Sequence, residues 1–136
     1  MTSAALPLQS AIRSLLAADA VLTGLLGAAR IFDGAPRDTP VPFVSLDDIV
    51  SKRRDGLAAT IEEHRITLRV WSKAGGKSEA MAAADRIVAL LDDAAPILAG
   101  HRVIRLLIEQ TESRLAKDRL SAETALRFLA LTEPTD

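Results

Sequence analysis

The stretch Ile66–Asp93, ITLRVWSKAGGKSEAMAAADRIVALLDD, carries a strand pattern, a glycine turn and a helix pattern in one run. From Ile66 to Val70, apolar residues alternate with more polar ones, which is the period of a half-buried strand. After Gly75 and Gly76, apolar residues recur on one stripe of a 3.6-residue helix. The two glycines lie where the chain needs backbone freedom to reverse. The stretch therefore predicts a strand, a turn and a helix over Lys77–Asp92.

A strand pattern also precedes this stretch and pairs with it. We expect a strand over Phe43–Ser51, a charged turn at Lys52–Gly56 and a partner strand over about Ala59–Ser72. The Asp-Gly pair in the turn is a strong short-range signal for an antiparallel hairpin. The face of the first strand that we predict to point inward consists of Val44, Leu46, Asp48 and Val50.

The N-terminal third reads as two helices and a loop. Ser3 is a candidate cap for a first helix, in which Leu8, Ile12, Leu15 and Leu16 share one face. Asp19 and Gly27 would begin and end a second helix, Ala20–Leu26. Arg30–Phe32 reads as a brief extended piece. The prolines of Asp33–Pro42 exclude a helix there and indicate an extended loop.

The C-terminal third reads as a second hairpin. We predict a strand over Val103–Arg114 with Ile104, Leu106 and Ile108 on one face, and Leu107 suggests a central strand or one that touches neighbours on both faces. Leu115–Leu120 reads as a solvated connection, Glu123–Leu131 as the last strand and Thr132–Asp136 as a frayed tail. The sum is an α+β, two-layer fold. Its mostly antiparallel sheet has the N-terminal helices and one central helix packed on one side, in a single domain over residues 1–136.

Composition excludes several classes of function. The 136 residues contain no cysteine, which removes disulfides, thiolate catalysis and cysteine-based metal sites. The formal net charge of −1 gives no global attraction to nucleic acid or to an anionic membrane. We expect no membrane span and no secretion signal, and hence synthesis and assembly in the cytoplasm.

No catalytic motif emerges from the sequence. Gly76-Lys77-Ser78 looks like the end of a phosphate loop, but Trp71 stands where that loop needs a glycine. His64 and His101 lie far apart in sequence, and the ordinary expectation for each is a surface position. We therefore predict no catalytic residue, no cofactor site and no metal site, and no enzymatic activity.

Two features suit contacts with other macromolecules. Lys52-Arg53-Arg54 could touch phosphate or an acidic partner surface, although a solvated turn is the commoner role of such a cluster. Trp71, the single tryptophan, fits core packing and a subunit interface about equally well, since tryptophan is enriched at interfaces.

The order of these elements resembles the tail-completion, or tail terminator, proteins of long-tailed bacteriophages and phage-derived gene transfer agents. The resemblance spans nearly the whole chain. It is carried by Arg30-Ile31-Phe32, by the proline-rich approach to Phe43, by Leu68-Arg69-Val70-Trp71-Ser72 with its glycine turn and helix, and by Leu126-Arg127-Phe128. The chain departs from the family pattern by lacking a glycine between its last two strands, which leaves the shape of the Leu115–Leu120 connection open.

The resemblance implies a homo-oligomer, commonly a hexameric ring, in the neck or tail of a virion. Such a ring caps the major tail tube protein, stops its polymerisation and meets a head-side stopper or connector protein, while DNA passes through the lumen unread. A closed ring needs two different complementary faces on each copy. The residues that we predict for the assembly interface are Asp33, Arg37, Asp38, Lys52, Arg53, Arg54, Asp55 and Trp71. The alternatives are a head-side stopper or adaptor of the same particle and, in a different class, a small cytoplasmic ligand-binding domain.

Overall fold

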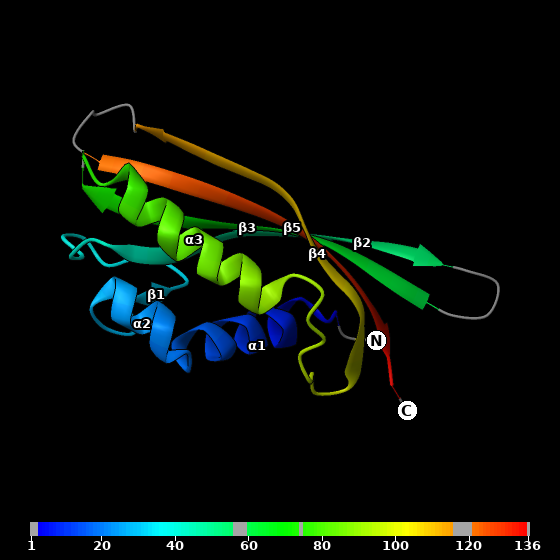
Figure 1. Ribbon diagram of the computed structural model, residues 1–136. Helices are drawn as coiled ribbons and strands as arrows, with labels where there is room; N and C mark the ends of the chain where they lie inside the picture. Colours follow the sequence, from blue (N-terminus) through cyan, green and yellow to red (C-terminus); the bar gives the residue numbers. More distant parts are fainter. Residues whose placement is uncertain (1–2, 56–59, 74, 116–120, 136) are drawn as a thin grey trace.

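The computed structural model describes residues 3–55, 60–73, 75–115 and 121–135. Three helices pack on a five-stranded sheet with strand order β1-β2-β3-β5-β4 (Figure 1). The elements are α1 (Ala5–Ala17), α2 (Ala20–Leu26), β1 (Ile31–Phe32), β2 (Phe43–Asp55), β3 (Thr60–Lys73), α3 (Lys77–Leu91), β4 (His101–Leu115) and β5 (Ser121–Pro134). Only the short β1 runs parallel to its neighbour, and the other pairs are antiparallel. The predicted α+β class is confirmed.

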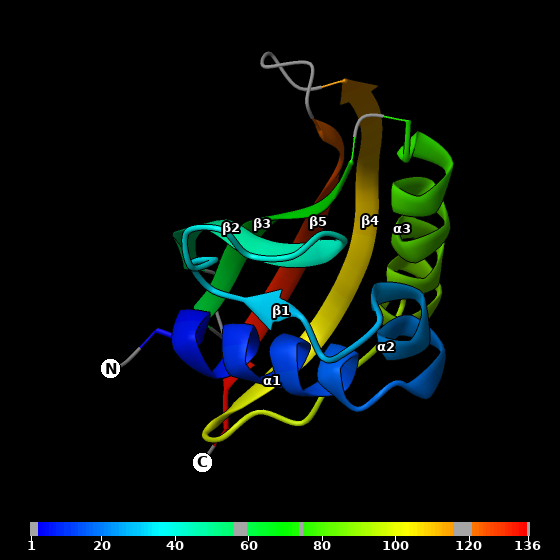
Figure 2. The same cartoon turned by 90° about the vertical axis from the view of Figure 1, so that its left-hand side faces the viewer.

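The core lies between the sheet and the helices, which all cover the same face of the sheet (Figures 1 and 2). The α1 stripe is buried as its period predicts, and α3 contributes mainly small residues. The buried residues of these two helices are Leu8, Ile12, Leu16, Ala80, Ala83, Ala84, Ile87 and Leu91. Alanines let α3 lie close to the sheet, where Leu68, Leu126 and Phe128 are fully or almost fully buried. Burying each large side chain contributes about 1.5–3 kcal/mol.

The two predicted boundaries of α2 are confirmed. Asp19 is the N-cap, and its carboxylate accepts a hydrogen bond of 2.8 Å from the Leu22 amide. Gly27 ends the helix with a left-handed φ of 86°. The Arg86 guanidinium of α3 binds both carboxylate oxygens of Asp19, at 2.9 and 2.7 Å. This bidentate contact, together with the cap, lowers the pKa of Asp19 to about 2 and ties α2 to α3.

The predicted inward face of β2 is correct only in its first half. Val44 and Leu46 are buried, but Asp48 is exposed and Val50 is 55% exposed. A bulge explains the change, because Leu46 pairs with Leu68 and Asp48 pairs with Thr67, so that Asp47 is an extra residue. An extra residue shifts the alternation by one, and Ile49 therefore packs on the core in place of its neighbours.

The strand β4 lies at the edge of the sheet and not in its centre. It carries two register shifts, between Val103 and Arg105 and between Ile108 and Gln110. The first shift turns Ile104 outward, to 45% exposure, and leaves Val103 and Leu106 in the core. Ile104 was therefore wrongly predicted to share the buried face of Leu106.

The strands β2, β4 and β5 are also longer than predicted. Lys52 to Asp55 continue β2 and do not form the expected turn, so the reversal itself lies outside the described residues. At the other end of the chain, the expected frayed tail is paired up to Pro134, opposite His101. The Leu115–Leu120 connection begins one residue later than expected, and residues 116–120 lie outside the described residues.

None of the helices in the described part of the chain lies on the second face of the sheet, which we call the uncovered face (Figures 1 and 2). Long side chains cross it as ion pairs between strands. Arg114 donates to Glu123 at 2.6 Å, Arg65 donates to Glu109 at 2.7 Å, and Arg69 pairs with Asp47. Glu123, the partner of Arg114, is only 4% exposed. The sheet thus presents a broad, charged surface on which several of the charged side chains form ion pairs with one another.

Candidate assembly surfaces

The predicted interface residues fall into two groups at opposite ends of the β2–β3 hairpin. Asp33, Arg37 and Asp38 lie on the loop that leads into β2, near Trp71, which is close to the end of β3. Lys52 to Asp55 lie at the other end of the hairpin. From Thr60 to Trp71 a strand spans about 35 Å. The structure therefore separates one predicted interface into two surfaces.

The first surface is the loop over residues 33–42, which we call the loop surface. Asp33, Arg37 and Asp38 are all exposed, and Asp38 adopts a φ of 64°, in the left-handed region. A guanidinium nitrogen of Arg30 donates to the Val41 carbonyl at 3.4 Å. Charged side chains are thus exposed on this loop, whose end near Val41 is hydrogen-bonded to Arg30.

Trp71 anchors this end of the sheet through aromatic contacts. Its ring stacks on Phe43 with centroids 6.3 Å apart, and Phe43 meets Phe32 edge-on at 6.2 Å. The indole Nε1 donates to Ser45 Oγ at 3.0 Å. The tryptophan is half-buried on the uncovered face and lies outside the main core. Packing within the chain accounts for one side of the ring, and a subunit interface at its exposed side stays a prediction.

The second surface is the basic arm, which we define as Lys52, Arg53 and Arg54 on β2. The hairpin that carries it projects beyond the helical layer (Figure 1). Because these residues belong to a strand, they alternate between the faces of the sheet. Lys52 and Arg54 lie on the uncovered face, where Arg54 pairs with Glu63 at 3.0 Å, while Arg53 lies on the helical side and lines a pocket.

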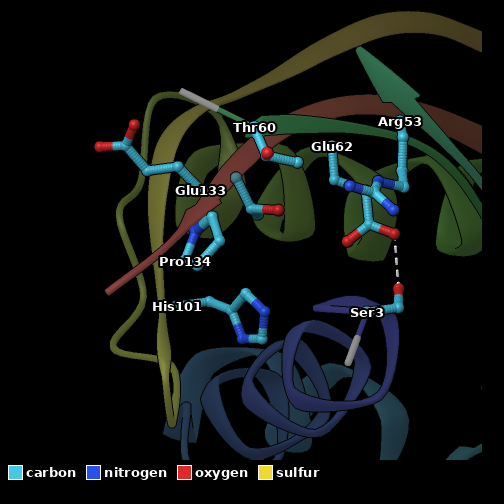
Figure 3. Close-up of a pocket in the computed structure, with 8 residues that line it drawn as sticks. Ser3, Arg53, Thr60, Glu62, His101, Glu133 and Pro134 are labelled. Atoms are coloured by element: carbon cyan, nitrogen blue, oxygen red, sulfur yellow. Dashed lines mark hydrogen bonds between the residues drawn. The ribbon is translucent and has the colours of Figure 1, made fainter. Parts of the chain in front are cut away.

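This pocket lies between the start of α1 and the ends of β3, β4 and β5 (Figure 3). Its volume is about 90 Å³, and its lining is Ser3, Arg53, Thr60, Glu62, His101, Thr132, Glu133 and Pro134. Polar groups converge on it, but ligand pockets usually have about 300–1,000 Å³. Ser3 and Glu62 share the capping role that we expected for Ser3: Ser3 Oγ accepts from the Ala5 amide at 3.1 Å and donates to the Glu62 carboxylate at 2.6 Å, and that carboxylate also accepts from the Ala4 amide at 2.8 Å. The arrangement fits a clasp for the start of α1 better than a ligand site.

His64 lies beside this clasp and is fully buried, contrary to the expected surface position. Its ring nitrogens lie 2.7 Å from Ser51 Oγ and 2.9 Å from Thr132 Oγ1. Glu62 shares its face, because residues two apart on a strand point the same way, and its carboxylate oxygen lies 3.5 Å from His64 Nε2. Burial lowers the pKa of His64, against an opposing effect of the Glu62 carboxylate and with a smaller lowering by His101.

The burial of His64 predicts a loss of stability in mild acid. The folded state binds a proton on this ring less readily than the unfolded state, whose pKa is about 6.5. The free energy of unfolding should therefore fall as pH drops below about 6.5 and continue to fall until the pH reaches the folded pKa. Urea unfolding at several pH values from 8 to 5 measures this trend. In His64→Gln, which keeps a side-chain donor and acceptor, the slope should be smaller; an unchanged slope would contradict the assignment to His64.

A third surface was not predicted from the sequence. An open apolar groove of about 660 Å³ runs between α1 and residues 96–99, with Leu6 and Ile97 at its rim. Their side chains are 72% and 97% exposed. Pro96 was expected only to end the helical region, and the apolar pair after it, Ile97 and Leu98, was the one available signal in the sequence. A single exposed apolar side chain is ordinary, but a contiguous apolar patch such as the lining of this groove is typical of an interaction surface.

Among the described residues, no three His, Asp or Glu side chains are grouped so as to hold a metal ion. Nor is any single described helix long and apolar enough to span a bilayer; α1 and α2 pass that test of length and composition only as a pair, with a 78° bend between them.

The comparison with known proteins shows what kind of protein carries these surfaces. The family described as tail completion protein gp17 matches residues 10–133, which is most of the chain. The chain belongs to this family. Its members are structural proteins of phage tails, so the surfaces above belong to a protein that assembles with other tail or head proteins.

A solved structure supports the same assignment. A chain of the structure titled "Virion of native gene transfer agent (GTA) particle" matches with a TM-score of 0.87 and 26% sequence identity. The match covers 98% of this chain and 99% of that chain, so the two folds correspond from end to end. No curated protein matches this sequence.

Proposed function

We propose that this chain is a ring-forming tail terminator. Copies close into a ring on the end of the tail tube, stop its polymerisation and present a surface to the head-side connector of a phage or gene transfer agent particle. The match of almost the entire fold to a chain of such a particle carries this proposal. DNA passes through the ring without sequence-specific contacts.

The separation of the loop surface from the basic arm supports a ring. A closed ring requires a heterologous interface, in which each copy offers two different complementary faces. Two different exposed surfaces about 35 Å apart on one hairpin give each copy separate regions for contacts with its neighbours in the ring and with the tube or the connector, whereas a twofold dimer would need only one self-complementary face.

The direct test is to make particles without the chain and to measure their tails by electron microscopy. We expect tubes of variable and excessive length that are not joined to capsids. Unjoined tubes of uniform length would instead identify a head-side stopper. Normal particles with joined tails of uniform length would overturn the proposal.

Charge reversal at the basic arm should reduce joining of tubes to capsids without unfolding the chain. Arg53→Glu and Arg54→Glu place like charges where we propose a contact with an acidic surface, and like-charge pairs at an interface are strongly unfavourable. Lys77→Glu is a matched control, because Lys77 is exposed at the start of α3, where a negative charge is tolerated. The readouts are the yield of joined particles and the thermal midpoint. Unchanged yield for both arm variants would remove the arm from the assembly surfaces.

A further inference from the structure

Within the described residues, each edge of the sheet is covered over one part and open over another, and we call the open part the open half of its strand. On the β2 edge, β1 pairs only with Val44 and Ser45, so the remainder of β2 has no strand on its outer side within the described residues. On the β4 edge, the Asp93 amide donates to the Leu106 carbonyl at 2.7 Å and Asp92 accepts from the Ile108 amide at 3.0 Å. Past this point, the segment 109–115 has no partner on its outer side in the described part of the chain.

The two open halves lie at opposite ends of the sheet. Paired positions run from Glu112 through Ala125 and Arg69 to Ser45, so the later part of the open half of β4 is level with the part of β2 that β1 covers. Likewise, Lys52 is level with Arg105, outside the open half of β4. Two copies placed side by side without a shift would therefore leave the open halves only partly opposite each other.

We propose that the open half of β2 in one copy pairs antiparallel with the open half of β4 in the next copy, with a shift of about 20 Å along the strands. This inference rests on the proposed ring and names the contact that builds it. The strand directions agree with this pairing. The strands β2, β3, β5 and β4 alternate in direction across the sheet, and the β2 strand of the next copy would continue that alternation beside β4. The arm would extend over its neighbour, and backbone hydrogen bonds left open in one copy would be formed between copies.

Charge supports the same alignment. Lys52 and Glu112 both lie on the uncovered face and both belong to the open halves. Other charged side chains of that face, such as Arg114 and Glu109, have partners within the chain. Neither Lys52 nor Glu112 has an ion-pair partner among the described residues, and their charges are opposite. The shifted pairing brings these two side chains together, and the uncovered faces of successive copies then form one continuous surface.

Disulfide trapping tests the alignment directly, because the natural chain has no cysteine. Lys52→Cys is combined in turn with a cysteine at Gln110, Glu112 or Arg114, which share its face of the sheet. Particles assembled with each variant are oxidised and separated by non-reducing electrophoresis. We expect a ladder of linked copies for at least one of the three, because disulfides form only between Cα atoms less than about 7 Å apart. The control is Lys52→Cys with Arg105→Cys, the unshifted level, which should give no ladder.

Failure of this inference is distinguishable from failure of the proposed function. Variants that assemble particles with uniform, joined tails but form no ladder at any of the three positions would overturn the edge pairing and leave the terminator function standing. A ladder from the Arg105 control alone would replace the shifted pairing with a level one. A ladder in particles whose tails do not depend on this chain would keep the edge contact and overturn the terminator function.

Charge exchange adds a second readout: Lys52→Glu and Glu112→Lys should each lower the yield of joined particles, and the double variant should recover it.

Discussion

Replacing Phe128 by alanine should lower the free energy of unfolding by about 3–5 kcal/mol. Phe128 lies on β5 between Ile66 of β3 and Ile108 of β4, and its side chain is 1% exposed. Aromatic residues make up only 3% of the chain, and Phe128 is the largest side chain in the core. The small alanines of α3 are poorly suited to fill the space that the ring would leave. Native domains typically have a free energy of unfolding of about 5–15 kcal/mol, so this loss would be a large share of the total stability.

Urea unfolding followed by far-ultraviolet circular dichroism measures this effect. Phe128→Leu keeps most of the volume and should lose less than about 1.5 kcal/mol, which gives a folded comparison if the alanine variant unfolds. Leu6→Ala, at a side chain that is 72% exposed, should change the stability by no more than about 0.5 kcal/mol. Equal losses for Phe128→Ala and Leu6→Ala would contradict the position of Phe128 in the core.

The second large effect is expected for Gly76→Ala, at about 1–3 kcal/mol. A Cβ at this position would overlap Ser72 Oγ and lie 3.0 Å from the Lys73 carbonyl oxygen. Neither neighbour can move freely, because Ser72 is fully buried and donates to Glu79 at 2.5 Å, and the Lys73 carbonyl accepts from the Gly76 amide at 2.8 Å. The glycine is therefore required for close approach of the turn to β3.

Thermal and urea unfolding of Gly76→Ala, Gly34→Ala, Ser72→Gly and the Gly76→Ala/Ser72→Gly double variant would test this explanation. Gly34→Ala is the matched control, because a Cβ there meets nothing within 4 Å, and it should be nearly neutral. Combining Gly76→Ala with Ser72→Gly removes the overlapping side chain, so the double variant should lose less than the sum of the single losses. Strict additivity would show that the collision with Ser72 is not the cause.

The helices could be predicted from the sequence because their apolar stripes and their capping residues are set by residues close together in the chain. The α1 stripe, the Asp19 cap and the Gly27 stop are all found where the pattern places them. The strand faces were predictable only up to the first bulge. Period-2 reasoning assumes that no residue is inserted, and an insertion at Asp47 reverses every later assignment on β2. No residue at that position signals the insertion.

The candidate surfaces were harder to predict, since they depend on contacts between distant segments. The charged cluster before the Asp-Gly pair was placed in a turn, yet backbone pairing with β3 continues through it whatever its side chains are. His64 was assigned to the surface because its partners, Ser51 and Thr132, lie on other strands. The exposure of Ile97 depends on where the segment after α3 meets α1, which no periodicity encodes.

Because Trp71 stacks on Phe43 beside the loop surface, its fluorescence can report on contacts at that surface. With one tryptophan and no tyrosine, the protein's ultraviolet emission comes almost entirely from the ring beside the loop surface. We expect titration with tube or connector protein to shift that emission and to protect it from acrylamide quenching when the loop surface is engaged. A tryptophan-free version of the added component would let docking be followed in real time without a dye.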